Sequence, residues 1–483
     1  MRLCKIHLYP TRRNTTAMNS LRFRHCICAG TFLLLLINLT SVAQEPRVLT
    51  LEESIEIAKQ SNLTVQTVEQ SLKTAEAQVR TARAGLLPRI TASGNYTYFK
   101  DIQKSVIQAD GGFGFPMPGG EMDEMSPPRA DNESDLIELE FGAHHNVQGT
   151  VNLTQPIFAW GRYYYGYQAA KLNYQAIQRD VDAAYNQLRL DVSEVFYGVL
   201  IAQEFVRIAQ QSVSLVEKQL DIAEASLKAG AATDFDVLRA NVQLANAKSQ
   251  LVRAENAIIT AKNAYKTVLN IPLAEDVSVK GTLEIPKKYQ MPALNLDTLI
   301  EQALKNRPEV HRTQVSEHAA HKQVDIAKTR HLPDLGLFTN YQISQNERLT
   351  QMNRIWSVGL QINIPIFDGF ATRAAVQQSE STLKQVQLGG IQVRVGVEFE
   401  VRNAYLNLLG AQTLIDVQRE AVAQAQESVR IANLQFQNGI ITTVALTDTQ
   451  LALAQAEVNR LQAYHDYIVG LARLEKAIGQ TLE

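Results

Sequence analysis

"LLPRITASGNYTYF", residues 86–99, interrupts a sequence whose composition is otherwise helical over long distances. A similar stretch, "HLPDLGLFTNYQIS", occupies residues 331–344. In both, a Leu-Pro pair ends the helical pattern, because proline disfavours helix in the residue before it. Apolar and polar side chains then alternate, and this period of two predicts a β-strand. The sequence therefore predicts a change from helix to strand at two places.

The two stretches belong to a unit that occurs twice. "LTLEESIEIAKQSN" (49–62) is similar to "LNLDTLIEQALKNR" (294–307), and Pro88 and Pro333 keep the same offset of 245 residues. Internal similarity of this kind decides the architecture of a chain, because each copy forms the same structural unit.

Further along, the offset between the two copies changes. "QPIFAWG" (155–161) and "IPIFDGF" (364–370) lie 209 residues apart, as do Gly230 and Gly439. The first copy therefore holds an insertion of 36 residues. Each copy reads as helix (51–86 and 296–331), two strands, a long helix and a shorter helix. The predicted divisions are a signal peptide at 1–43, repeat 1 at 44–270 with a long external loop at 99–146, a linker at 271–293 and repeat 2 at 294–483.

Residues 1–43 have the pattern of an export signal, with a basic start, a short apolar stretch and a small-residue cleavage site before Gln44. Met18 is an alternative start, and a retained membrane anchor is the alternative to cleavage. The only cysteines, Cys4, Cys26 and Cys28, lie in this segment. The mature chain would then have no disulfide and no thiolate metal site. No apolar run of membrane-spanning length follows Ala43.

The predicted strands have the length that crosses a bilayer at a tilt. Their polar positions are uncharged Thr, Ser, Asn and Gln, which suit a water-filled lumen. A half-buried soluble sheet would show the same alternation, but aromatic residues gather after the second strand and favour a membrane interface. The predicted strands are 90–98, 147–154, 335–343 and 356–364, and the predicted strand-exit and girdle residues are Pro156, Phe158, Trp160, Pro365 and Phe367.

Residues 161–229 form a helical pattern without proline. At ~1.5 Å per residue such a helix extends on the order of 100 Å, which indicates a coiled coil or tube. Gly230 and Gly439 follow the long helices, where a left-handed C-cap favours glycine. We expect these glycines to form helical-tip turns opposite the strands.

The helix after Gly230 carries two apolar stripes, which predicts neighbours on two sides. Four strands cannot close a barrel with a lumen, so the strand edges require other copies of the chain. The first stripe follows Val237, Ala240, Leu244, Ala247, Leu251, Ala254, Ile258, Ala261, Tyr265 and Val268, and the second follows Val242, Ala245, Val252 and Ile259.

Over residues 49–480 the sequence resembles the TolC-type outer membrane efflux channels. The resemblance lies in the Leu-Pro pairs, the two "PIF" stretches (156–158 and 365–367), and the glycine turns followed by "DVLRANVQLANA" and "LTDTQLALAQAE". It implies a mainly α fold with a small β part: a homotrimer whose long coiled-coil helices form an α-barrel in the periplasm. Four strands per protomer would form a transmembrane β-barrel in the outer membrane of a Gram-negative bacterium.

The resemblance also implies a function and partners. Such a channel passively conducts substrates across the periplasm and outer membrane, in efflux or type I secretion. Its partners would be outer membrane lipid, a periplasmic adaptor (membrane fusion) protein and an inner-membrane RND or ABC pump.

In that family, aspartates near the second glycine turn line a constriction. Asp448 matches one of these positions, whereas Ala445 occupies the other. Asp236 matches an aspartate that bonds an arginine at the tip, but Ile441 replaces the arginine. The resemblance therefore implies a constriction at Asp448, with Asp236 as a second candidate. The alternative is that both are ordinary solvated turn residues.

No phosphate-binding loop, His-Glu metal motif or nucleophile elbow occurs in the sequence, so we expect no enzyme, cofactor or metal site. The net charge of −2 does not favour a nucleic-acid partner. The competing interpretation is a soluble periplasmic coiled-coil scaffold or adaptor without a pore.

Overall fold

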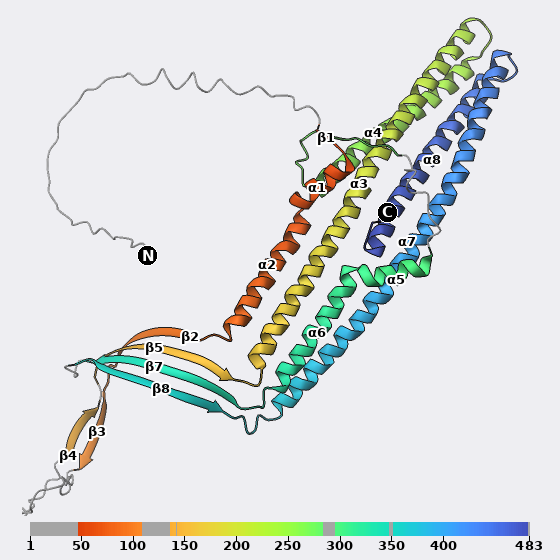
Figure 1. Cartoon of the computed structure of the whole chain (residues 1–483). Helices are drawn as coiled ribbons and strands as arrows, with labels where there is room; N and C mark the ends of the chain where they lie inside the picture. Colours follow the sequence, from red (N-terminus) through yellow and green to blue (C-terminus); the bar gives the residue numbers. More distant parts are fainter. Residues whose placement is uncertain (1–46, 109–135, 142, 284–294, 347–350, 482–483) are drawn as a thin grey trace, which may run out of the picture. The chain divides into compact units, whose positions relative to one another are not determined.

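A computed structural model describes residues 47–108, 136–141, 143–283, 295–346 and 351–481 (Figure 1). From Val48 onward, the described residues form one compact unit. The predicted signal peptide lies outside the described residues and remains a prediction.

The two halves of the chain contain helices of matching length. The long helices α3 and α7 have 67 residues each, and the shorter helices α4 and α8 have 36 each. The helices are α1 (Leu51–Ser61), α2 (Leu63–Ala84), α3 (Arg162–Lys228), α4 (Asp234–Leu269), α5 (Leu296–Asn306), α6 (Pro308–Lys328), α7 (Ala371–Gln437) and α8 (Thr443–Ile478).

The single helices expected at 51–86 and 296–331 are each two helices, so this prediction was wrong. Between α1 and α2, the Asn62 side-chain oxygen accepts hydrogen bonds from the backbone N–H groups of Thr64 and Val65, at 2.9 and 3.2 Å. Asn62 thus caps a new helix. Between α5 and α6, Pro308 is the first helical residue and forces Arg307 into an extended conformation (φ −66°, ψ 125°).

The described residues contain eight strands, four more than predicted. The strands are β1 (Arg47–Leu49), β2 (Arg89–Tyr98), β3 (Gln103–Gln108), β4 (Leu136–Phe141), β5 (His145–Phe158), β6 (Val277–Val279), β7 (Asp334–Asn346) and β8 (Asn353–Asn363).

The region expected as a long loop at 99–146 is partly ordered into strands. β3 and β4 pair with each other in antiparallel fashion near its two ends. The sequence "LIELEF" of β4 alternates apolar and acidic residues, a strand pattern that the acidic and Gly-rich composition of the whole region obscured. Residues 109–135 lie outside the described residues.

The four predicted strands correspond to β2, β5, β7 and β8, which lie in one antiparallel sheet of order β2-β5-β7-β8. Its register places Val151 opposite Tyr341, and Tyr341 opposite Trp356. Apolar positions of neighbouring strands therefore share one face. On the other face, the Asn340 side-chain amide donates to the Asn152 side-chain oxygen at 2.7 Å.

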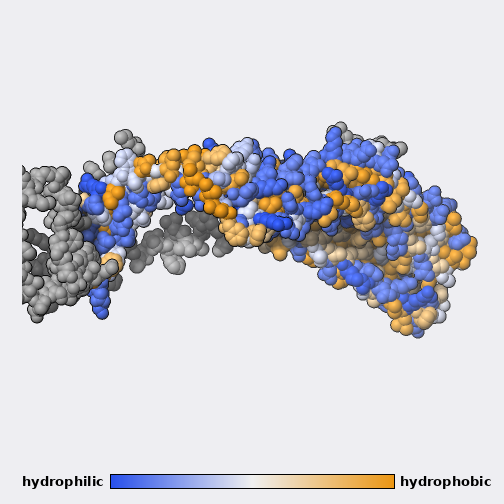
Figure 2. Space-filling view, turned by 90° about the horizontal axis from the view of Figure 1, so that it is seen from below, coloured by the Kyte–Doolittle hydropathy of each residue, from blue (hydrophilic) through white to orange (hydrophobic). Residues whose placement is uncertain are grey.

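The apolar face of this sheet is open to solvent. Ile90, Trp356 and Leu360 are 67, 74 and 64 % exposed. Figure 2 shows a band of hydrophobic residues over the sheet. β2 and β8 form the two edges, and among the described residues neither has a second partner strand.

The helices lie side by side in two connected rows (Figure 1). Near the sheet the order is α2, α3, α6, α7, and toward the hairpin tips it is α4, α3, α8, α7. α3 and α7 run through both rows, and α4 and α7 occupy the two ends of the row at the tips. Within the described residues, no helix combines the length and the apolarity needed to span a membrane.

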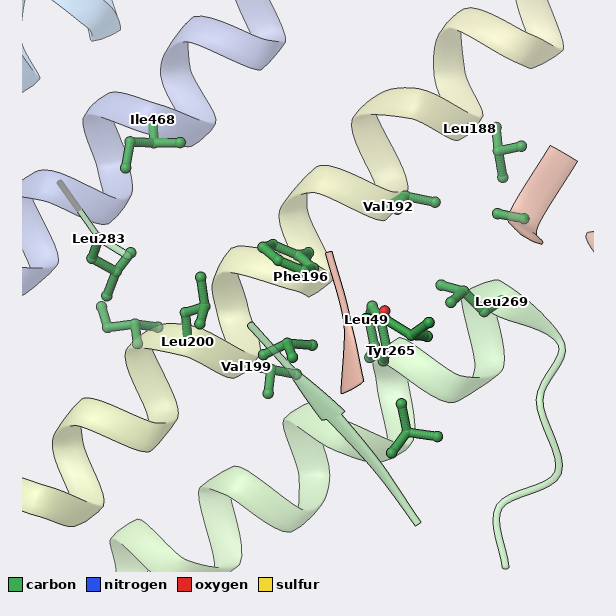
Figure 3. Close-up of a cluster of buried hydrophobic side chains, with 14 of the residues drawn as sticks. Leu49, Leu188, Val192, Phe196, Val199, Leu200, Tyr265, Leu269, Leu283 and Ile468 are labelled. Carbon is green, nitrogen blue, oxygen red and sulfur yellow. The ribbon is translucent and has the colours of Figure 1, made fainter. Parts of the chain in front are cut away.

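A hydrophobic core lies where the rows meet, and Figure 3 shows its centre. Phe196 of α3 packs against Tyr265 of α4, with ring centroids 6.3 Å apart. The Tyr265 hydroxyl lies 2.5 Å from the hydroxyl of Ser54 in α1. Leu49 of β1 and Ile468 of α8 belong to the same cluster. Helix α1 and the β1–β6 pair thus pack against the middle part of the long helix α3.

The break at Arg307 holds a buried ion cluster. The Arg307 guanidinium, 5 % exposed, donates to the carboxylates of Glu309 (2.9 and 3.0 Å) and Glu400 (2.5 Å). Lys476 donates to the other oxygen of Glu400 at 2.6 Å. Burial by itself raises the pKa of both carboxyl groups. Hydrogen bonds and the charges of Arg307 and Lys476 outweigh burial and hold each pKa below its usual range. The cluster ties α6 to α7 and α8.

Replacing Arg307 by Met tests this cluster. Because the substitution leaves a partly buried carboxylate without its main partner, we expect the free energy of unfolding to fall by about 3 kcal/mol. Arg179→Met removes an exposed pair with Asp182 and is the control, with an expected loss below ~0.5 kcal/mol. Denaturant unfolding followed by circular dichroism measures both, and equal losses would contradict the assignment.

The same cluster predicts acid sensitivity. Glu309 and Glu400 have a lower pKa folded than unfolded. Their stabilisation is therefore complete above the unfolded pKa, near ~4.3, and is lost as the pH falls through the folded pKa. Melting curves of the wild type and of E309Q/E400Q should converge below about pH 4. A stability difference that stays constant from neutral to acid pH would refute this explanation.

Candidate functional site

The turns between strand and long helix use two successive left-handed residues. They are Trp160 and Gly161 (φ 50° and 81°) in the first half, and Gly369 and Phe370 (φ 63° and 66°) in the second. Glycine adopts this conformation freely, but a bulky aromatic residue does so only under strain. Each turn thus holds one strained aromatic residue.

Each turn also carries an aromatic pair. Phe158 and Trp160 make an edge-to-face contact with centroids 5.1 Å apart, and Phe367 and Phe370 make one at 5.7 Å. All four side chains are exposed. Phe370 was missed by sequence comparison, because the offset of 209 residues aligns Trp160 with Gly369. The aromatic partner has moved by one residue.

The predicted strand exits differ between the halves. Pro365 and Phe367 lie beyond the end of β8, as expected. In the first half Pro156 lies inside β5, whereas Phe158 is the last residue of this strand. The pairing with β7 shifts register between Pro156 and Phe158, and such an irregularity accommodates a proline that has no N–H to donate.

Gly230 and Gly439 form the two hairpin tips, with φ values of 72° and 70°. After α3, Ala231 N–H donates to the Ser226 carbonyl at 2.8 Å. After α7, Ile440 N–H donates to the Gln435 carbonyl at 2.9 Å. This six-to-one bond with glycine at the preceding position is the Schellman motif. Local backbone chemistry thus fixes both tips.

Asp236 is engaged in capping α4. Its carboxylate accepts hydrogen bonds from the backbone N–H of Thr233 (2.9 Å) and from the Thr233 hydroxyl (2.8 Å). Both hydrogen bonds lower the pKa of Asp236, and the bond from the Thr233 backbone has the larger effect. At the matching position of α8 stands Ala445, whose N–H donates to the Thr442 hydroxyl at 3.3 Å. Only the first tip has the complete capping box.

Asp448 lies exposed in the second turn of α8. Among the described residues it has neither a hydrogen-bond nor an ion-pair partner. No such contact joins it to Asp236, so one chain does not bring the two candidates together by direct bonding. Within the same described part of the chain, no group of three or more His, Cys, Asp or Glu could hold a metal ion.

The second apolar stripe of α4 is uncovered. We call it the free α4 stripe, and its spacings of three and four residues keep it on one side of the helix. The first apolar stripe of α4, from Val237 to Val268, is covered, since every one of its residues is buried or half-buried. The free α4 stripe comprises the exposed residues Phe235, Leu238, Val242, Ala245, Ser249, Val252, Asn256 and Ile259.

At the other end of the row, α7 is also uncovered along one side. Its exposed apolar side chains include Leu388, Ile391, Val395, Phe399, Leu406, Val417, Ile431 and Leu434. Both ends of the helical row therefore expose apolar surface, as both edges of the sheet expose unpaired strands.

Comparison of the sequence with known families finds a match to the outer membrane efflux protein family over residues 54–270 and 299–480. The outer membrane efflux protein BepC of Brucella suis is 27 % identical over 180 residues, which cover 37 % of this chain and 40 % of BepC. The outer membrane protein TolC of Vibrio cholerae is 25 % identical over 194 residues, covering 39 % and 44 %. The aligned part thus spans about two fifths of these relatives.

Solved structures extend the likeness of fold over most of the chain. The CmeC outer membrane channel of Campylobacter jejuni superposes with a TM-score of 0.73 at 16 % identity, covering 89 % of this chain and 85 % of CmeC. The open state of the MtrE outer membrane channel of Neisseria gonorrhoeae gives 0.69 at 19 % identity, covering 90 % and 89 %. Since the family match covers both halves of the sequence, the chain belongs to the outer membrane efflux protein family.

Proposed function

We propose that the chain is one subunit of a homotrimeric outer-membrane channel. The channel passively conducts substrates delivered by a periplasmic adaptor and an inner-membrane pump, either RND or ABC. The observation that carries this proposal is the four-stranded sheet, whose apolar face is exposed and whose two edges are unpaired. Family membership supports the outer-membrane location and the role in efflux.

The sheet supplies the membrane part. Three copies, with β8 of one subunit beside β2 of the next, give a closed barrel of twelve strands without a free edge. The apolar face, which includes Val151, Tyr341 and Trp356, then contacts lipid. The face with Asn152 and Asn340 lines the lumen. The exposed aromatic pairs at Trp160 and Phe370 lie at the barrel end nearest the helices, where an interfacial girdle is favourable.

The helices close in the same manner. The free α4 stripe of one subunit faces the uncovered side of α7 in the next, so that the helices α3, α4, α7 and α8 of three subunits form a tube of twelve helices. Within the subunit, α3 packs against α4 and α8, and α7 packs against α8. Packing α4 of one subunit on α7 of the next thus covers the apolar surfaces at both ends of the helical row.

The hairpin tips supply the periplasmic end. Gly230 and Gly439 turn the helices there, and Asp448, exposed and without a described partner, lines the constriction. Asp236 stabilises the start of α4, which keeps the first tip in shape. The tips are also the end that an adaptor protein meets.

The first experiment extracts the mature protein from outer membranes in mild detergent, measures its native mass and records conductance in planar bilayers. A trimer that conducts supports the proposal. A soluble monomer or dimer absent from the outer membrane would favour the periplasmic scaffold instead.

Two adjacent substitutions test the lipid-facing side of the sheet. Val358 lies on the apolar face at the middle of β8, and Ser357 lies on the polar face. V358R should disfavour insertion by about 2–4 kcal/mol, because arginine at the bilayer midplane is costly, whereas S357R should be tolerated. The amount of folded protein in outer membranes measures both. Equal amounts of the two variants would contradict the orientation.

A second pair tests subunit closure. Val252→Glu places a charge in the free α4 stripe, and Gln250→Glu places one two residues away on the same helix. We expect V252E to lose the trimer in native mass measurements, because a buried unpaired charge costs several kcal/mol, while Q250E remains trimeric. A trimer of unchanged stability in V252E would show that another surface closes the ring.

A further inference from the structure

Outside its apolar stripes, α4 carries a mostly polar stripe that α8 repeats at the offset of 209 residues. On each helix the residues recur at spacings of three and four and so lie along one side, and each stripe includes one alanine. The polar α4 stripe is Arg239, Gln243, Asn246, Gln250, Arg253 and Ala257, and the polar α8 stripe is Asp448, Ala452, Gln455, Asn459, Gln462 and Asp466. All are exposed except Gln243, which is half-buried.

Part of the polar α4 stripe and one residue of the polar α8 stripe, Gln455, line one shared groove, and Arg239 and Asp448 lie nearer the tips than the residues of each stripe that line it. A groove of about 570 Å³ runs between α4 and α8 over α3. Asn246 and Gln455, which are equivalent residues of the two halves, both line it, as do Gln243, Gln250 and Arg253. For this pair, residues that are equivalent in sequence lie along the same groove.

Charge is distributed unequally over these equivalent positions. Arg239 of α4 corresponds to Asp448 of α8, each nine residues beyond its tip glycine. Farther from the tip, α4 has Arg253 and α8 has Asp466, and each of these is equivalent to an uncharged residue of the other helix. The α4 stripe thus carries only positive charge and the α8 stripe only negative charge.

Within the described residues, neither Arg239 nor Asp448 has a hydrogen-bond or ion-pair partner. Asp448 has no described bonding partner. The Arg239 charge acts on Asp236 and contributes to its lowered pKa, after the hydrogen bonds from Thr233. No hydrogen bond ties the Arg239 guanidinium to a described residue.

We propose that Arg239 is a specificity-determining residue of the channel. This inference rests on the proposed function. In the trimer, three Arg239 and three Asp448 side chains form one ring of alternating sign at the constriction. Rings of a single charge select ions of the opposite sign. A balanced ring conducts anions and cations alike and suits substrates that are neutral or zwitterionic.

The balance is tested by reversal potentials of the purified trimer in planar bilayers under a KCl gradient. The wild type should reverse near zero. R239Q leaves only the acidic charges, so its reversal potential should shift toward the potassium equilibrium potential, and hexamminecobalt(III) should block it. D448N should shift toward the chloride potential, and R239Q/D448N should return near zero.

Arg430→Gln is the matched control, because Arg430 lies nine residues before Gly439 on α7 and is exposed. It should not move the reversal potential. R239K, which keeps the charge, should behave as the wild type and guards against a change that arises from misfolding, with trimer mass checked for each variant.

The outcomes separate the two proposals. A wild-type protein that does not conduct would overturn the proposed function itself. A wild type that conducts with strong cation selectivity, or an R239Q whose reversal potential equals that of the wild type, would overturn the role of Arg239 alone.

Discussion

Nothing in the described part of the chain covers the apolar face of the four-stranded sheet, and the rest of the architecture depends on that constraint. Side chains such as Ile90, Trp356 and Leu360 expose large apolar surfaces that are stable only against lipid or protein. The strands β2 and β8 also present unpaired edges. Pairing the edges alone would leave the apolar face exposed to water, and covering the face alone would leave the edges unpaired. A closed ring of subunits in a membrane would pair the edges and cover the face.

The junction between sheet and helices shows how the chain holds its aromatic side chains in place. Trp160 and Phe370 both have left-handed backbones, a conformation that costs of order 1 kcal/mol or more for a non-glycine residue. The glycine next to each aromatic residue does not relieve the backbone strain of that residue. The two halves reach the same arrangement with the aromatic residue at different positions of the turn, which argues that the placement of the ring is what matters. The interfacial role proposed for these rings would account for that strain.

Local backbone chemistry explains which parts of the fold could be predicted from the sequence. Pro88 and Pro333 restrict the backbone beside them, and β2 and β7 begin directly after these prolines. Gly230 and Gly439 adopt the left-handed conformation that glycine allows, and the long helices end there. The alternation of apolar and polar residues along the strands predicted which side chains share each face of the sheet. The break at Asn62 was missed because an asparagine cap is hard to distinguish from a polar helix position. The Arg307 cluster could not be foreseen, since its partners Glu400 and Lys476 lie 93 and 169 residues away.

The candidate site was predictable in part, and the missing part follows from the duplication. Positions that the backbone constrains keep their residue type in both halves, as the tip glycines do. Other positions near the tips differ between the halves, so that Asp236 corresponds to Ala445 and Arg239 corresponds to Asp448 at the offset of 209 residues. A ring of six identical hairpins could carry only one charge at each level. A chain that contains two unlike hairpins can carry opposite charges at equivalent positions. In the proposed trimer, the two copies would therefore allow the charge of the proposed constriction to differ between neighbouring hairpins.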